Sequence, residues 1–190
     1  TPSLNQISRI SGKRNNKKNN DLLFEVYGSS IWFQICKMYE KYSNKELTLK
    51  ERFINQYKKE KCKVLDWGVG CGRVAKYVNT DCLSFFGVDI DYENINWCKE
   101  NLKGNYIHTS LNPPLPFKDK SFDLIYGISI LTHLNKKYEL IWLEEISRLL
   151  TNDGIAILSI LGADAAADIG KLDSFLSSKG FLDFGKNDDL

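Results

Sequence analysis

The chain has 190 residues, of which 43% are hydrophobic and 26% are charged, and its net charge is +2. This length fits a single domain, and this composition excludes collagen, coiled-coil and wholly disordered chains. The charge is uneven, because residues 1–20 contain five basic and no acidic side chains, which leaves the rest with a net charge of −3. A mildly acidic body argues against a nucleic-acid-binding protein.

Five cysteines are scattered along the chain, and no two of them form a Cys-x-x-Cys pair. This pattern argues against a disulfide framework or a zinc site and favours a reducing compartment. The sequence also lacks a signal-peptide core and the run of about 18 to 20 apolar residues that a membrane span needs. We therefore expect a soluble cytoplasmic protein that binds neither a metal nor a membrane.

The N-terminal part of the chain is expected to form a tail and a helical extension. Residues 1–20 are polar and basic, so we expect them to be disordered. Residues 21–62 are expected to form a helical extension that could act as a lid. Within it, apolar residues at helical spacing predict a helix over residues 29–42, and a second helix is expected over residues 49–57.

Residues 63–190 alternate short apolar runs with helical patterns. The runs predict strands over residues 63–67, 83–88, 106–108, 122–126, 155–161 and 181–184. The patterns between them predict helices over residues 73–78, 92–102, 139–150 and 165–178. This alternation predicts a doubly wound α/β fold, with a mostly parallel, Rossmann-like sheet and helices on both faces.

The most informative stretch begins where the first of these strands ends in Asp66. Three glycines then alternate with other residues at the mouth of the next predicted helix: Gly68, Gly70 and Gly72. Glycines let the backbone approach a ligand closely, and a helix N-terminus offers free N–H groups. The dinucleotide fingerprint needs a third glycine where this chain has Arg73, which disfavours a nicotinamide-dependent oxidoreductase. A tight turn without a ligand is the alternative.

This stretch resembles motif I of the class I S-adenosylmethionine-dependent methyltransferases, in which an apolar strand precedes Asp-x-Gly-x-Gly-x-Gly. The second predicted strand, ending in Asp89, resembles the family strand whose terminal acid binds the ribose hydroxyls of the cofactor. A carboxylate can accept hydrogen bonds from two vicinal hydroxyls. Asp91 is the competing candidate, but it is better placed to cap the following helix.

The resemblance continues over residues 63–185, through Leu-Pro-Phe at 115–117, Ser-Phe-Asp-Leu-Ile-Tyr at 121–126, Thr-His-Leu at 132–134 and Asp-Gly at 153–154. Two features depart from the family pattern. No acid precedes Leu-Pro-Phe, so the adenine contact would fall to Ser110, to the backbone of Leu111, or to neither. Few residues follow the sixth predicted strand, so we expect the family's seventh strand to be missing.

The resemblance implies S-adenosyl-L-methionine as the cofactor. The residues expected to bind it are Asp66, Gly68, Val69, Gly70, Gly72, Asp89, Ile90, Ser110, Leu111 and Ile128. His133 is the candidate catalytic base, because it follows the fourth strand and its ordinary pKa suits proton transfer. The alternative for His133 is a cap on the next helix.

The expected function is methyl transfer to a small-molecule or glycan acceptor. The alternatives are a non-catalytic binding protein of the same fold, or a nucleobase or protein N-methyltransferase. Asn112-Pro113-Pro114 is similar to the Asn-Pro-Pro motif of nucleobase methyltransferases, but in that family the motif follows the fourth strand. Here it precedes that strand, which favours a rigid turn.

Overall fold

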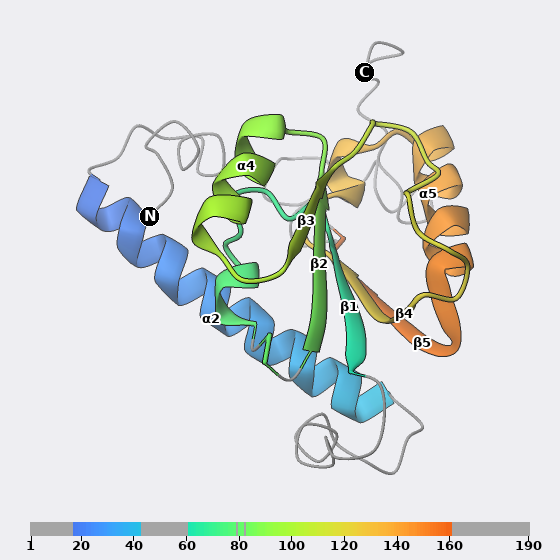
Figure 1. The fold of residues 1–190 in the computed structure, drawn as a ribbon, viewed down its shortest axis with the longest axis horizontal. Helices are drawn as coiled ribbons and strands as arrows, with labels where there is room; N and C mark the ends of the chain where they lie inside the picture. Colours follow the sequence, from blue (N-terminus) through green and yellow to red (C-terminus); the bar gives the residue numbers. More distant parts are fainter. Residues whose placement is uncertain (1–16, 43–60, 79, 82, 161–190) are drawn as a thin grey trace, which may run out of the picture.

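The computed structural model describes residues 17–42, 61–78, 80–81 and 83–160, without the side chains of residues 17–27. Its centre is a five-stranded sheet in the order β3-β2-β1-β4-β5 (Figure 1). All neighbouring strands are parallel, which confirms the predicted fold class. The strands are β1 (Cys62–Trp67), β2 (Leu83–Asp89), β3 (Asn105–His108), β4 (Phe122–Gly127) and β5 (Leu150–Leu158).

The order of the strands decides where a ligand can bind. From β1 the chain passes outward to β2 and β3, and it then returns to the other side of β1 to form β4 and β5. In open sheets of this kind, ligands bind at the carboxyl ends of the strands where the direction of winding reverses. That point lies between β1 and β4, at the upper edge of the sheet in Figure 1.

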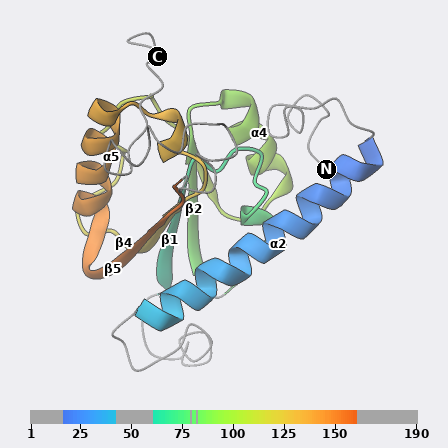
Figure 2. The same ribbon diagram turned by 180° about the vertical axis from the view of Figure 1, so that it is seen from behind.

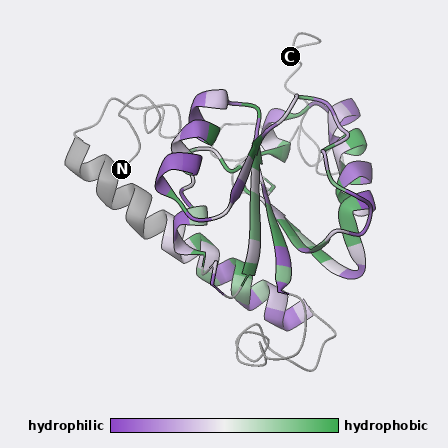
Figure 3. Cartoon of the chain, viewed as in Figure 1, coloured by the Kyte–Doolittle hydropathy of each residue, from purple (hydrophilic) through white to green (hydrophobic). Residues whose placement is uncertain are grey.

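Helices cover both faces of the sheet, as the sequence predicts. Helices α2 (Lys17–Tyr42) and α4 (Tyr92–Asn101) pack on one face, and α5 (Lys136–Leu149) packs on the other (Figures 1 and 2). Side chains of a strand alternate between the two faces. In β1, Val64 therefore joins the core beneath α2 while Leu65 joins the core beneath α5. Figure 3 shows the green of hydrophobic residues along much of the central strands.

The helix predicted over residues 73–78 is the main correction. The structure has only a 3-10 turn there, η1 (Ala75–Tyr77). The glycine turn uses the first part of the connection from β1 to β2. Helix α2 lies against this segment, since a side chain on Gly28 would collide with the carbonyl of Arg73.

Helix α2 also corrects the predicted N-terminal boundary. It begins at Lys17, so the prediction of disorder over residues 1–20 is wrong for residues 17–20. Once a helix is nucleated, each further residue adds a hydrogen bond, so a helix held by packing at one end extends into polar sequence. Residues 1–16 and the helix predicted over residues 49–57 lie outside the described residues.

Strand β5 begins earlier than predicted. Its register against β4 jumps from Phe122–Leu150 to Leu124–Ile155, so residues 151–154 form a bulge. The predicted Asp-Gly turn is this bulge, which lets a single strand follow α5 directly. The helix predicted over residues 165–178 and the strand over residues 181–184 lie outside the described residues. Of the described helices, none combines the length and apolar character needed to cross a bilayer.

Candidate functional site

The glycine turn after β1 places two of its glycines against protein and one against open space. All three have positive φ angles, +79° at Gly68, +54° at Gly70 and +73° at Gly72, which side chains rarely tolerate. A side chain at Gly68 would meet Ile130, and one at Gly72 would meet Leu102. At Gly70, no atom lies within 4 Å of the place where a side chain would begin. Gly70 is therefore the point at which a ligand can approach the backbone.

Backbone hydrogen bonds fix this turn to the end of β2. The N–H groups of Gly68 and Val69 both donate to the carbonyl of Val88 at 2.9 Å, and the N–H of Gly72 donates to Val69 at 3.0 Å. The turn is thus a rigid structure that joins the ends of β1 and β2. It holds the Gly70 backbone beside the last residue of β2, Asp89.

Asp89 binds the glycine turn through its side chain. Its Oδ2 accepts a hydrogen bond from the N–H of Gly70 at 2.7 Å, and its Oδ1 accepts one from the N–H of Asp91 at 2.8 Å. Burial raises the pKa of Asp89, although the backbone N–H groups oppose that shift. Each carboxylate oxygen can accept more than one hydrogen bond, so both remain able to accept ribose hydroxyls.

Asp91 has the role that the sequence predicts for it. Its Oδ1 accepts a hydrogen bond from the N–H of Asn94 at 3.1 Å, and Asp91 is the N-cap of α4. The prediction that Asp91 caps this helix is therefore confirmed. Asp89 and Asp91 thus have different roles, because Asp91 caps α4 while Asp89 binds the glycine turn.

Asp66, at the carboxyl end of β1, is buried and is 4% exposed. Its Oδ2 accepts a hydrogen bond of 2.8 Å from the hydroxyl of Tyr126. Burial raises the pKa of Asp66 to about 7, with Asp89 adding to the rise, while the bond from Tyr126 and the charge of Arg73 lower it. Near neutral pH, the charge of Asp66 therefore depends on the groups around it, namely Tyr126, Arg73 and Asp89.

The segment after β3 begins against Asp89 and then turns away. The N–H of Thr109 donates to the Asp89 carbonyl at 2.9 Å. Ser110 is exposed and its hydroxyl donates to the carbonyl of Asn112 at 2.7 Å, while Leu111 is half-buried. No described contact joins the side chain of Ser110 to the glycine turn, and its role in adenine binding stays a prediction.

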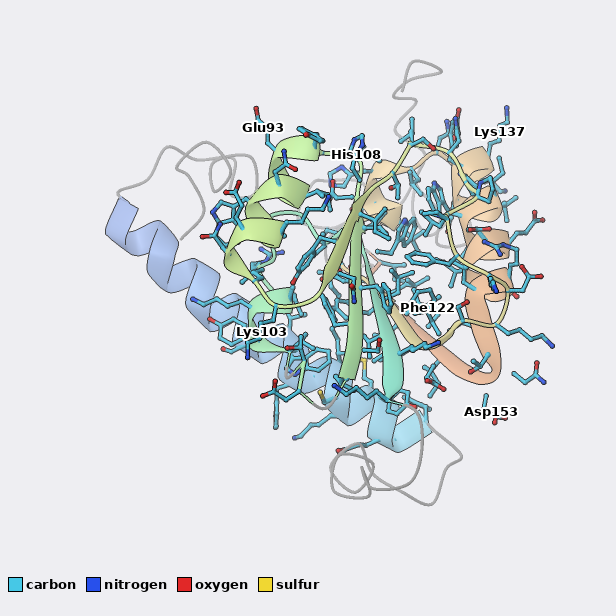
Figure 4. All side chains as sticks on the ribbon, in the orientation of Figure 1. Glu93, Lys103, His108, Phe122, Lys137 and Asp153 are labelled. Atoms are coloured by element: carbon cyan, nitrogen blue, oxygen red, sulfur yellow. The ribbon has the colours of Figure 1, made fainter. Side chains whose placement is uncertain are left out.

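The two predicted isoleucines occupy different environments. Ile90, directly after Asp89, is 56% exposed, which is unusual for so large an apolar side chain. The Nε2 of His108, at the end of β3, forms a hydrogen bond of 3.1 Å with the Ile90 carbonyl, and Figure 4 shows His108 at the upper edge of the molecule. Ile128, just beyond β4, is half-buried against the core beneath α2.

His133 is exposed and lies in a 3-10 turn, η2 (Leu131–His133). It does not cap the next helix, because the N-cap of α5 is Asn135, whose side chain accepts from the N–H of Tyr138 at 3.1 Å. The alternative of a helix cap is therefore wrong for His133. The turn starts after Ile130, whose side chain packs on Gly68, so η2 belongs to the same edge of the sheet.

Two further side-chain interactions in the structure were not predicted from the sequence. One is the bond between Tyr126 and Asp66. The other is a clamp in which Glu145 of α5 accepts from the N–H of Leu115 at 2.7 Å and from Arg148, while Arg148 donates to the carbonyl of Phe117 at 3.0 Å. Burial raises the pKa of Glu145, but these hydrogen bonds outweigh it and hold the pKa below its usual value. The sequence gives one indication of each interaction: Tyr126 lies in an apolar strand and Glu145 in an amphipathic helix, and a tyrosine or glutamate buried there needs a polar partner.

Comparison with known proteins points to a methyltransferase domain. Residues 65–158 match the family described as "Methyltransferase domain". An uncharacterised protein of Methanocaldococcus jannaschii is 30% identical over 147 residues, which are 76% of this chain and 54% of that protein. The chain thus spans about half the length of this relative.

Two solved structures share the fold. An S-adenosylmethionine-dependent methyltransferase from Methanosarcina mazei has a TM-score of 0.53 and 22% identity, over 65% of this chain and 63% of that one. The plantazolicin methyltransferase, in complex with S-adenosylhomocysteine, has a TM-score of 0.55 and 19% identity, over 91% of this chain and 62% of that one. Residues 65–158 therefore carry a methyltransferase domain, and they have the fold of these S-adenosylmethionine-dependent methyltransferases.

Proposed function

We propose that the protein binds S-adenosylmethionine at the carboxyl ends of β1 and β2 and transfers its methyl group to a small-molecule or glycan acceptor. The observation that carries the proposal is the bond between Asp89 and the N–H of Gly70, directly beside the open side of Gly70. A carboxylate for ribose hydroxyls and a backbone without a side chain lie next to each other there. These are the two features that a nucleoside needs at a sheet edge.

Each predicted residue has a distinct part in this proposal. Asp89 accepts hydrogen bonds from the ribose hydroxyls, and the exposed Ile90 offers an apolar surface for the adenine ring. The turn from Gly68 to Gly72 gives the ligand a close approach to the backbone. Asp66 supplies negative charge for the cationic methionine part. Ser110 and Leu111 follow β3 at the same edge and would border the base.

The bound cofactor supplies a sulfonium-activated methyl group, so the protein needs to do little covalent chemistry. Its own contribution is to hold the acceptor in line and to exclude water. Where the acceptor is a hydroxyl, His133 is proposed to remove the proton, because η2 places it at the ligand-binding edge and its side chain is exposed. An amine acceptor that enters uncharged needs no such base.

Two observations favour a small acceptor over a nucleic acid. The chain beyond residue 20 has a net charge of −3, which would repel a phosphate backbone. Asn112-Pro113-Pro114 lies between β3 and β4, and the Asn112 carbonyl already accepts the Ser110 hydroxyl. In nucleobase methyltransferases the similar motif follows the fourth strand, so its position here does not support that function.

The test has two steps. Calorimetry should detect binding of S-adenosylmethionine and S-adenosylhomocysteine but not of NAD, and NAD binding alone would overturn the assignment. A screen of metabolites and glycans with methyl-labelled cofactor should then find an acceptor. Cofactor binding without label transfer to any of them, and with transfer to RNA or protein instead, would refute the proposed acceptor class.

A further inference from the structure

We propose that Tyr126 is a positioning residue, whose buried hydroxyl holds the Asp66 carboxylate in one orientation and in its charged form for a cationic part of the cofactor. The inference rests on the proposed function and extends it to a residue that does not itself need to touch the ligand. It makes cofactor affinity depend on a hydrogen bond between two strands.

The geometry of the pair follows from the sheet. Asp66 of β1 lies directly opposite Tyr126 of β4 in the parallel register, and neighbouring residues in register project from the same face. Tyr126 is completely buried, and its hydroxyl donates to Asp66 Oδ2 at 2.8 Å. The bond therefore spans the switch point between the two halves of the sheet, where the ligand is expected.

Helix α2 packs over Tyr126. The ring of Trp32 lies 6.1 Å from the ring of Tyr126, and Ile35 and Tyr39 of the same helix are 2% and 0% exposed. A carboxylate in such apolar packing loses its charge unless a donor satisfies it. Phenylalanine would fill the same space as Tyr126, so the hydroxyl is the part of the side chain that serves Asp66.

Charged and titratable groups surround Asp66 from several elements. Tyr126 of β4 and Arg73 of the glycine turn favour its charged form, whereas Asp89 of β2 disfavours it. Cys98 of α4 and Tyr106 of β3 also interact with Asp66, and burial raises the pKa of both well beyond neutral. They stay uncharged near pH 7, so Asp66, whose pKa is about 7, is the member of this cluster whose charge the experiment follows.

A cationic ligand binds the charged form of Asp66 better than the neutral form. Its affinity should therefore rise with pH through the pKa of Asp66, which is about 7. Removing the Tyr126 hydroxyl should move this rise to higher pH. If the shift is about one pH unit, binding at pH 7 weakens about fivefold and recovers largely by about pH 8.5.

The experiment compares wild type, Tyr126→Phe and Asp66→Asn. S-adenosylhomocysteine, which carries the ammonium group, is titrated calorimetrically between about pH 6 and pH 8.5, and the Asp66 carboxyl is titrated by NMR without ligand. Tyr106→Phe is the matched control, since it removes a hydroxyl that donates to the Lys103 carbonyl and not to an acid. We expect Tyr126→Phe to raise the midpoint in both measurements, Tyr106→Phe to leave it in place, and Asp66→Asn to abolish it.

The outcomes separate the inference from the function beneath it. If wild type binds S-adenosylhomocysteine but Tyr126→Phe keeps the wild-type pH profile and the wild-type Asp66 midpoint, the inference is wrong and the proposed function stands. If Tyr126→Phe does not fold, Asp66→Asn decides, because an unchanged pH profile in that variant excludes Asp66. If wild type binds no ligand at any pH, the proposed function fails and the inference fails with it.

Discussion

The substitution Asp89→Ala should have two effects: weaker cofactor binding and a less stable glycine turn. Its carboxylate accepts from the N–H groups of Gly70 at 2.7 Å and of Asp91 at 2.8 Å, and both bonds disappear in the variant. Hydrogen bonds to a charged group contribute about 1.5–3 kcal/mol each, but water can reach this half-buried site. We therefore expect unfolding free energy to fall by about 1.5–3 kcal/mol in total, which lowers Tm by about 3–10 °C.

The loss of affinity adds to this change. The same carboxylate is proposed to accept two ribose hydroxyls, so cofactor binding should weaken by at least about 2 kcal/mol, or about thirtyfold. Calorimetry with S-adenosylhomocysteine, below the Tm of the variant, measures the affinity, and thermal unfolding without ligand measures the stability. The two effects are separable because only the first depends on the ligand.

Asp91→Ala is the matched control two residues away. It removes the N-cap of α4 and should reduce unfolding free energy by about 1 kcal/mol while affinity stays the same. If Asp91→Ala abolished binding and Asp89→Ala left it intact, the assignment of the two acids would be reversed. If neither changed affinity, Asp89 would not bind the ribose.

Three further predictions concern other parts of the site. His133→Ala should lower turnover with a hydroxyl acceptor by about 10²-fold or more at unchanged cofactor affinity, and a loss below about threefold would exclude a base. Arg148→Leu leaves the Glu145 carboxylate without its main donor and should reduce unfolding free energy in denaturant by about 3 kcal/mol. The pKa of Asp66 is raised to about 7, so between about pH 4 and pH 7 the folded state holds a proton that the unfolded state has lost. The unfolding free energy should therefore fall as pH rises through this range. Asp66→Asn should make that fall smaller when unfolding free energy is measured by urea titration at several pH values.

Local sequence signals predicted the strands and the glycine turn well. β1, β2 and β4 are short, largely apolar runs in a parallel sheet, and such runs are visible without any knowledge of the fold. Asp91 was likewise predictable as a cap, because a cap acts on the residues that directly follow it. The register jump in β5 was not, since a bulge depends on the partner strand.

Interactions between distant segments were beyond the sequence. The bond from Tyr126 to Asp66 joins residues 60 positions apart, and the clamp from Glu145 to Leu115 joins residues 30 apart. The residue types show that each buried polar group needs a partner but do not show which one. The segment predicted as a helix over residues 73–78 forms only a 3-10 turn, and it packs against α2, a distant segment whose contact the local sequence does not reveal.

The position of α2 has a consequence for the limits of the catalytic unit. The family match begins at residue 65, yet Ile35 and Tyr39 of α2 form part of the same core as Val64 and Tyr126. A protein cut at the limits of the family match would expose one face of its central strands to water. The folding unit is therefore larger than the region that carries the family's signature, and part of its core is supplied by a helix that lies outside the family match.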